Sequence, residues 1–132
     1  MPGLDVHLVT PEREVWAGEA DFVIARSVEG DLGILPEHAP ILAALAVGAV
    51  YIEAGGNRTA FVVDGGFLHV GELEEQTRVD ILAEHAVAQE ELGQEDVAEW
   101  ERRAEELRGE GNFSEARTEK AKAATRRRLG AG

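Results

Sequence analysis

The chain has 132 residues, of which 44% are hydrophobic, 30% are charged and only 5% are aromatic. This length suits one domain, or one small domain with an appendage, and the ordinary apolar content excludes collagen-like, mucin-like and fully disordered chains. The absence of cysteine excludes a disulfide framework, a thiolate nucleophile and a Cys-based zinc site. No apolar run reaches the roughly 18–20 residues that span a bilayer, and the first residues lack the features of a secretory signal. We therefore expect an intracellular protein without membrane insertion.

The charge is acidic overall but unevenly distributed. The net charge is −13, from 13 basic and 26 acidic residues, which argues against a nucleic-acid binder because phosphate contacts need a basic surface. Residues 1–90 contain 4 basic and 16 acidic residues, whereas residues 116–132 contain 6 basic residues and 1 acidic residue. This one positively charged segment is the first indication of where a partner binds.

Residues 1–90 carry the pattern of short β-strands. Apolar residues alternate at Leu4, Val6 and Leu8, which predicts a half-buried strand over residues 4–9. Similar patterns predict strands over residues 22–25, 50–53, 59–63, 67–70 and 77–82, with a hairpin turn at residues 55–57. Short strands separated by glycines, with no helix between them to make a crossover, indicate an antiparallel β-sandwich.

From about residue 91 the apolar period becomes helical, at Val97, Trp100, Ala104 and Leu107. Gly109 and Gly111 end this helix. Asn112 is the expected cap of a second helix over residues 113–129, with Glu115 at the N3 position of a capping box. Because only alanines form the apolar stripe of the second helix, we expect the helical hairpin to be marginally stable unless it docks.

No pattern in the sequence predicts catalysis or metal binding. His7, His38, His69 and His85 are far apart and have no partner at metal-ligand spacing. The acidic pairs at 74–75 and 105–106 look like solvated surfaces, and no nucleophile elbow or phosphate-binding glycine motif is present. We therefore expect a chain that is not an enzyme and that holds no metal and no cofactor.

Residues 27–41 combine turn-forming residues with apolar ones. The two groups are Gly30, Gly33, Pro36 and Pro40, and Leu32, Ile34, Leu35 and Ile41. The first group requires a shaped loop. Two interpretations remain open: a corner where the chain crosses between sheets, or a loop that presents apolar surface to a partner.

Residues 30–41 read GDLGILPEHAPI. In its order of glycines, prolines and histidine this stretch resembles the characteristic loop of the ε subunit of rotary F-type ATP synthases. Three further stretches support the resemblance, namely VWAG at 15–18, VDGGFL at 63–68 and VDILAE at 79–84. The resemblance spans nearly the whole chain, and the composition favours a bacterial member of the family.

The resemblance implies an α+β fold, with an antiparallel β-sandwich of about ten short strands over residues 1–88 and an antiparallel two-helix hairpin over residues 89–132. It implies a non-catalytic central-stalk subunit of the rotor that couples proton translocation through the c-ring to ATP synthesis. Such a subunit is peripheral to the cytoplasmic face of the bacterial plasma membrane.

The resemblance also implies two sets of contact residues in the sandwich. The set expected to contact the polar loops of the c-ring is Glu29, Gly30, Asp31 and Leu32. The set expected to contact the γ subunit is His38, Pro40, Ile41 and Leu42.

In this family the hairpin is a regulatory element that folds beside the sandwich or extends along γ into the catalytic head, where it opposes ATP hydrolysis. Its basic second helix is then expected to bind an acidic segment of the β subunit transiently, through Lys120, Lys122, Arg126, Arg127 and Arg128. A second interpretation is intramolecular, because the acidic first helix complements the basic second one. Both interpretations hold if they describe different states.

Some family members bind ATP through a motif at the start of the first helix. Asp96 matches that motif, but Glu99 stands in place of its arginine and Trp100 in place of its alanine. A carboxylate repels a polyanionic ligand, so we expect no nucleotide site. The alternative function is a free-standing sandwich that binds a small ligand, with the hairpin as a lid. Co-purification with the other ATP synthase subunits separates the two.

Overall fold

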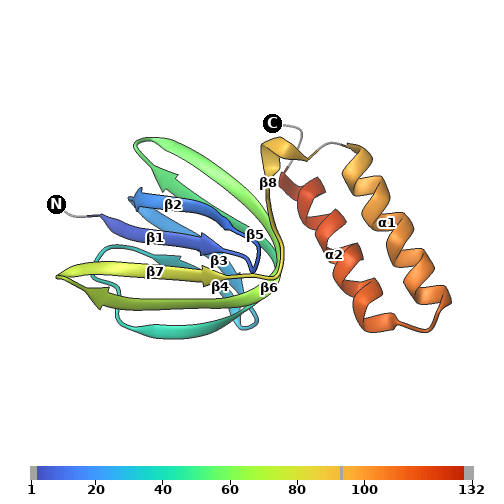
Figure 1. Cartoon of the computed structure of the whole chain (residues 1–132), viewed down its shortest axis with the longest axis horizontal. Coiled ribbons are helices and arrows are strands. Elements are labelled where there is room, and N and C mark those ends of the chain that lie inside the picture. The colour runs from blue at the N-terminus through green and yellow to red at the C-terminus, as the bar shows by residue number, and fades with distance from the viewer. Residues whose placement is uncertain (1–2, 93, 130–132) are drawn as a thin grey trace.

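The computed structural model describes residues 3–92 and 94–129 of the chain. Within them a β-domain precedes a pair of helices (Figure 1). The elements are β1 (Leu4–Val9), β2 (Glu14–Ala20), β3 (Phe22–Ser27), β4 (Gly30–Ile34), β5 (Ile41–Ala54), β6 (Asn57–Leu73), β7 (Gln76–Leu82), β8 (Ala86–Ala88), the short 3-10 turn η1 (Gln89–Glu91), α1 (Gln94–Gly109) and α2 (Phe113–Leu129). Neither helix, over the residues described, is long and apolar enough to cross a membrane.

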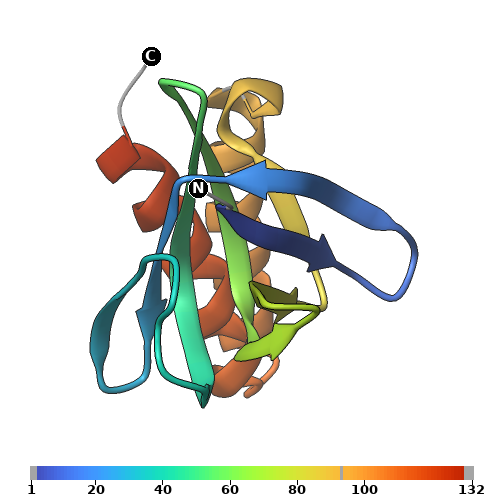
Figure 2. The ribbon, with the colours of Figure 1, turned by 90° about the vertical axis from the view of Figure 1, so that its left-hand side faces the viewer.

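The predicted α+β fold class is confirmed, with a strand count near the expected one. The strands follow the order β2-β1-β7-β6-β5-β3-β4, with β8 paired to β6, and the sheet curls over itself into two layers (Figure 2). All pairs are antiparallel except β1 with β7, which run parallel. The strands β5 and β6, of 14 and 17 residues, pass through both layers.

Residues 59–63 and 67–70, expected as two strands, belong to the single strand β6. The side of β6 that faces the core changes within this strand. Phe61 and Val63 contribute to the core before the change, and Leu68 and Val70 after it, so the buried positions shift from odd to even numbers. The intervening Gly65 and Gly66 have φ of 107° and 124°, values that glycine adopts far more readily than other residues. The alternation of buried and exposed residues is therefore interrupted, although β6 stays paired with β5.

Between the layers lies a core to which both layers contribute. The alternating residues Leu4, Val6 and Leu8 are fully buried, as expected, and they join Ile34, Val50, Leu68 and Ile81 among others in one cluster. Burying one such side chain stabilises the fold by about 1.5–3 kcal/mol. The sandwich is therefore built around a continuous apolar interior.

The segment 27–41 is a loop only in part, which corrects the expectation of one shaped loop. Gly30–Ile34 forms β4 and pairs with β3. The hydroxyl of Ser27 donates to the Gly30 carbonyl at 2.6 Å and accepts from the backbone N–H of Glu29 at 3.1 Å. These bonds close a tight hairpin turn, which the glycine content alone does not distinguish from a longer loop.

The helical hairpin forms where predicted, and it is docked. The backbone N–H of Glu115 donates to Asn112 Oδ1 at 3.4 Å, as a capping residue requires. The helix α2 packs against β5 and β6 (Figure 1). On the outer side of β6, away from the core cluster, Val62 is only 2% exposed. The alanines Ala116 and Ala123 of α2 are buried, and α2 contacts both α1 and the sheet, so the hairpin is docked on the sandwich.

We expect Gly66→Ala to lower the free energy of unfolding by about 2–4 kcal/mol. A Cβ at this position would lie 2.0 Å from the Leu82 carbonyl oxygen, and the backbone φ of Gly66 is +124°. Chemical denaturation followed by circular dichroism measures the change.

Gly33→Ala is the matched control, because a Cβ there meets no atom within 4 Å. It should change stability by no more than about 0.5 kcal/mol. Equal stability of the two variants would contradict the role assigned to the close approach at Gly66.

Candidate functional site

The turn between β3 and β4 forms a rigid, exposed tip. Val28 is 66% exposed at this tip, and Glu29, Gly30 and Asp31 are exposed beside it, while Leu32 is half-buried. The two hydrogen bonds of Ser27 hold the backbone of the turn. This tip contains the whole set expected to contact the c-ring, and it presents two carboxylates around one apolar side chain.

A second exposed surface, the apolar patch, consists of Leu42, Ala44, Phe67 and Leu82 on the outer side of one layer. Leu42 is 69% exposed, and Phe67 and Leu82 are each 54% exposed. Phe67 lies opposite Ala44 on β5 and opposite Leu82 on β7, so three adjacent strands contribute. Beside Phe67 and Leu82 a groove of about 410 Å³ extends to the β1–β2 turn. Contiguous exposed apolar surface of this kind marks an interaction site.

Sequence reasoning found Leu42 but missed Phe67 and Leu82. Phe67 precedes the fully buried Leu68, and Leu82 follows the fully buried Ile81. Apolar residues at adjacent positions of a strand point to opposite faces. This was the available signal, since one of the two faces must then be covered by something other than the core.

The remaining residues of the set expected to contact γ differ in their exposure. The backbone N–H of His38 donates to the Leu35 carbonyl at 3.1 Å, and its Nδ1 lies 2.7 Å from the Ala39 carbonyl oxygen. His38 and Ile41 are half-buried, and Pro40 is exposed. The β3–β4 tip and the apolar patch meet at one point, because the Val28 N–H donates to the Ala44 carbonyl at 3.0 Å. Neither residue belongs to the two predicted sets, but Val28 precedes the first set and Ala44 follows the second in the sequence.

The basic residues of α2 have partners inside the hairpin. Lys122 is buried, with its Nζ 3.2 Å from Glu119 Oε1 and 5.2 Å from the centroid of the Trp100 ring. Arg127 Nη2 lies 2.7 Å from Glu101 Oε1 on α1. Cations of α2 thus contact side chains of α1, as the intramolecular interpretation predicts for a hairpin folded beside the sandwich.

Two further cations of α2 bond to polar atoms other than carboxylates. Arg126 donates to the Leu92 carbonyl at 3.0 and 3.3 Å, and Arg128 donates to Thr125 Oγ1 at 3.2 Å. Lys120 is exposed. The five predicted residues are therefore not equivalent, since only some of them present their charge to solvent.

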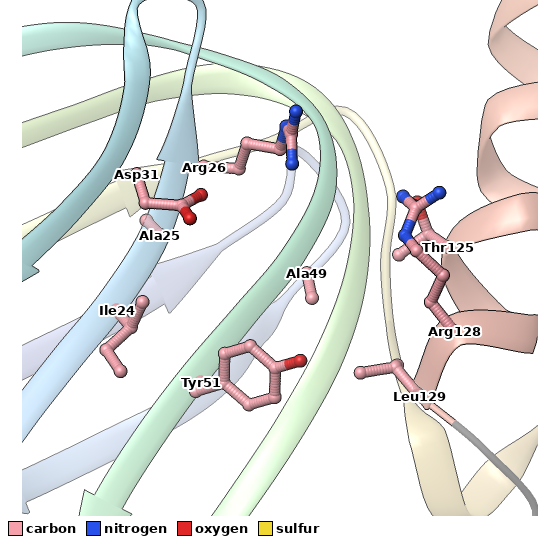
Figure 3. Close-up of a pocket in the computed structure, with 9 residues that line it drawn as sticks. All are labelled: Ile24, Ala25, Arg26, Asp31, Ala49, Tyr51, Thr125, Arg128 and Leu129. Atoms are coloured by element: carbon pink, nitrogen blue, oxygen red, sulfur yellow. The ribbon is translucent and has the colours of Figure 1, made fainter.

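A small hollow of about 160 Å³ separates the end of α2 from the sheet (Figure 3). Its polar lining includes Arg26, Asp31 and Tyr51 from the sheet, and Thr125 and Arg128 from α2. Asp31 belongs to the set expected at the c-ring, and Arg128 to the basic set of the hairpin. Their common hollow is a tertiary feature that no sequence spacing predicts.

The start of α1 carries an acidic surface at the position of the expected nucleotide motif. Glu99 is exposed and accepts a hydrogen bond from Arg102 Nε at 3.2 Å. This bond, with the charge of Glu106, raises the pKa of Arg102 above its usual value. The nearby Trp100 ring contacts Lys122. Glu99 thus offers a phosphate group a carboxylate in place of a cation.

Two histidines lie beside carboxylates. His7 Nε2 is 2.9 Å from Asp5 Oδ1, and its Nδ1 is 3.4 Å from Glu14 Oε2. His85 Nε2 is 3.9 Å from Asp64 Oδ2. Among residues 3–92 and 94–129, however, no three His, Asp or Glu side chains form a group that could hold a metal ion.

Comparison with known proteins identifies close relatives over most of the chain. The family model for the β-sandwich domain of the ATP synthase delta/epsilon chain matches residues 3–89. The ATP synthase epsilon chain of Thermobifida fusca is 42% identical over 133 residues, which cover 89% of this chain and 95% of the relative. That of Streptomyces coelicolor is 38% identical over 110 residues, which cover 83% of each chain.

A solved structure shares the fold, including the hairpin. A chain of the Euglena gracilis mitochondrial ATP synthase, from an assembly of OSCP, F1 and c-ring, superposes with a TM-score of 0.80 over 98% of this chain and 82% of that one. The sequence identity is 23%, so this likeness concerns the architecture.

We expect no measurable binding of ATP at millimolar concentration, because the carboxylate of Glu99 repels phosphate. Isothermal titration calorimetry of the full chain tests this. The double variant Glu99→Arg with Trp100→Ala, which restores the two departures from the motif, is the matched comparison. Binding of ATP by the unaltered chain would contradict the prediction.

Proposed function

The chain belongs to the ATP synthase epsilon chain family and is a non-catalytic stalk subunit of that enzyme, and we propose that it binds the rotor through two adjoining surfaces. The observation that carries this proposal is the contact between the β3–β4 tip and the apolar patch through Val28 and Ala44. A single rigid corner of the sandwich thus offers a polar, acidic surface and an apolar one. Family membership favours this function over a free-standing ligand-binding sandwich.

The β3–β4 tip is the proposed contact with the c-ring. Glu29 and Asp31 suit the polar loops of a membrane ring, because exposed carboxylates retain their hydration and pair with cations or amide donors at an interface. Val28 adds an apolar anchor, and the Ser27 hydrogen bonds keep the tip from rearranging. Pre-organisation of this kind reduces the entropy lost on binding.

The apolar patch is the proposed contact with γ. Its exposed Leu42, Phe67 and Leu82 have the composition of the buried centre of a stable interface. Pro40 and His38 lie on the segment that leads into β5, shortly before Leu42. With γ on the patch and the c-ring at the tip, the sandwich couples proton translocation to ATP synthesis as part of the rotor.

The hairpin is the proposed regulatory part. In its extended form the basic residues of α2 oppose ATP hydrolysis by pairing with an acidic segment of the β subunit. We infer that the subunit is peripheral, at the cytoplasmic face of the plasma membrane, where the c-ring emerges. The observation that supports regulation is the concentration of cations on one helix of an otherwise acidic chain.

The first test is binding to γ. Leu42→Asp and Phe67→Asp should each weaken co-elution with γ, with an increase in Kd of about tenfold or more, because a charge enters the apolar patch. Leu73→Asp is the matched control, since Leu73 is 53% exposed at the β6–β7 turn and lies outside the patch. Equal loss in all three variants, or no loss in any, would argue against the patch as the γ contact.

The second test is ATP hydrolysis by catalytic head depleted of its own ε subunit. Added full-length chain should slow hydrolysis, whereas residues 1–90 should bind γ without slowing it, because the cations reside on α2. Co-elution with γ serves as the folding control for the truncated chain. Equal slowing by both would remove the hairpin from the inhibitory role.

A further inference from the structure

Three of the five cations assigned to the inhibitory contact are engaged by the hairpin and its connecting segment. Lys122 contacts Trp100, Arg127 contacts Glu101 and Arg126 contacts the Leu92 carbonyl. Two of the partners lie on α1, and the third lies in the segment that joins the sandwich to α1. None of these contacts can persist if α2 leaves α1 and the connecting segment.

The contact of Lys122 is the most buried of the three. The Lys122 residue is 8% exposed, and a lysine is rarely buried without a partner. Its ammonium lies 5.2 Å from the Trp100 ring centroid and 3.2 Å from Glu119 Oε1, within the range of a cation–π interaction. Because this pair is shielded from water, it outweighs an exposed ion pair between the same helices.

The end of α2 is also tied to the connecting segment. Arg126 Nη2 donates to the Leu92 carbonyl at 3.0 Å, and Gln89 Nε2 donates to the Leu129 carbonyl at 3.2 Å. The last carbonyls of a helix lack partners within the helix, so Gln89 satisfies one of them. These two bonds tie the end of α2 to the segment that joins the sandwich to α1.

We propose that these four contacts form a latch that holds the hairpin folded by occupying the cations needed for inhibition. The latch comprises Trp100 with Lys122, Glu101 with Arg127, Leu92 with Arg126, and Gln89 with Leu129. The proposal rests on the inhibitory role assigned to α2 above. In the folded state Trp100 and Glu101 bind Lys122 and Arg127 in place of the acidic partner. These two cations can therefore contact α1 or the β subunit, but not both at once.

The latch predicts opposite effects for changes on its two sides. A change in Trp100 or Glu101 weakens the folded state and leaves the cations intact, so inhibition should increase. A change in Lys122 or Arg127 weakens the folded state and also removes the inhibitory charge. Extension should then occur without stronger inhibition.

The test uses the full chain, which has no native cysteine. Cysteines introduced by Glu12→Cys in the β1–β2 turn and Ser114→Cys at the hairpin tip carry spin labels, and pulsed electron resonance measures the distance between them. Trp100→Leu and Glu101→Gln should raise the ratio of extended to folded chains, by about fivefold or more and about twofold to fivefold, respectively. Glu105→Gln is the control of equal charge change, because Glu105 pairs with Arg108 on its own helix.

The same variants are then added to ε-depleted catalytic head. Trp100→Leu and Glu101→Gln should slow hydrolysis more than the unaltered chain, while Lys122→Met and Arg127→Met should not. Distance distributions of Trp100→Leu and Glu101→Gln that match those of Glu105→Gln would overturn the latch. If the distances shift and hydrolysis does not respond, the latch stands and the proposed inhibitory role fails. Glu101→Gln alters a partly exposed side chain, so it decides the matter even if Trp100→Leu does not fold.

Discussion

The ladder between β5 and β6 is the constraint on which the rest of the structure depends. It pairs the two strands along nearly their full length, and it turns through the corner between the layers at Gly65 and Gly66. The second of these glycines packs so closely on the Leu82 carbonyl that a Cβ would overlap it. On one side of the corner the ladder exposes Leu42 and Phe67. On the other side its outer face receives α2. The apolar patch and the face that receives α2 thus lie on the two sides of one bend.

Charge distribution explains how a thin apolar stripe suffices to keep the hairpin folded. The buried residues of α2 are Ala116, Lys122, Ala123 and Thr125, a set too small to drive docking through the hydrophobic effect alone. Cross-helix contacts of Lys122 and Arg127 supplement it. Individually weak interactions favour a small free-energy difference between two arrangements, which is the condition that a reversible regulatory element must meet.

The sequence predicted local features well and tertiary ones poorly. Alternation identified the buried Leu4, Val6 and Leu8, and the capping box predicted the start of the second helix at Phe113, because both signals depend on near neighbours. The sequence did not predict that β6 is continuous. At Gly65 and Gly66 the buried positions shift from one face of the strand to the other, and in the sequence this shift looks like the end of a strand. The burial of Lys122 was also missed: its partner Trp100 lies 22 residues earlier, and a lysine in a basic helix reads as solvated.

The packing of α2 on the outer side of β6 has a consequence for the protein's behaviour in solution. Val62 and Ala60 are outside the core cluster, yet they are 2% and 8% exposed. In the extended form proposed above, α2 would leave the outer side of β6, and this strip of the sheet would lose its cover. An extended chain would then expose Val62 and Ala60, and exposed apolar surface of this kind favours association with other molecules. Docking of α2 on the sheet therefore also keeps this apolar strip out of water.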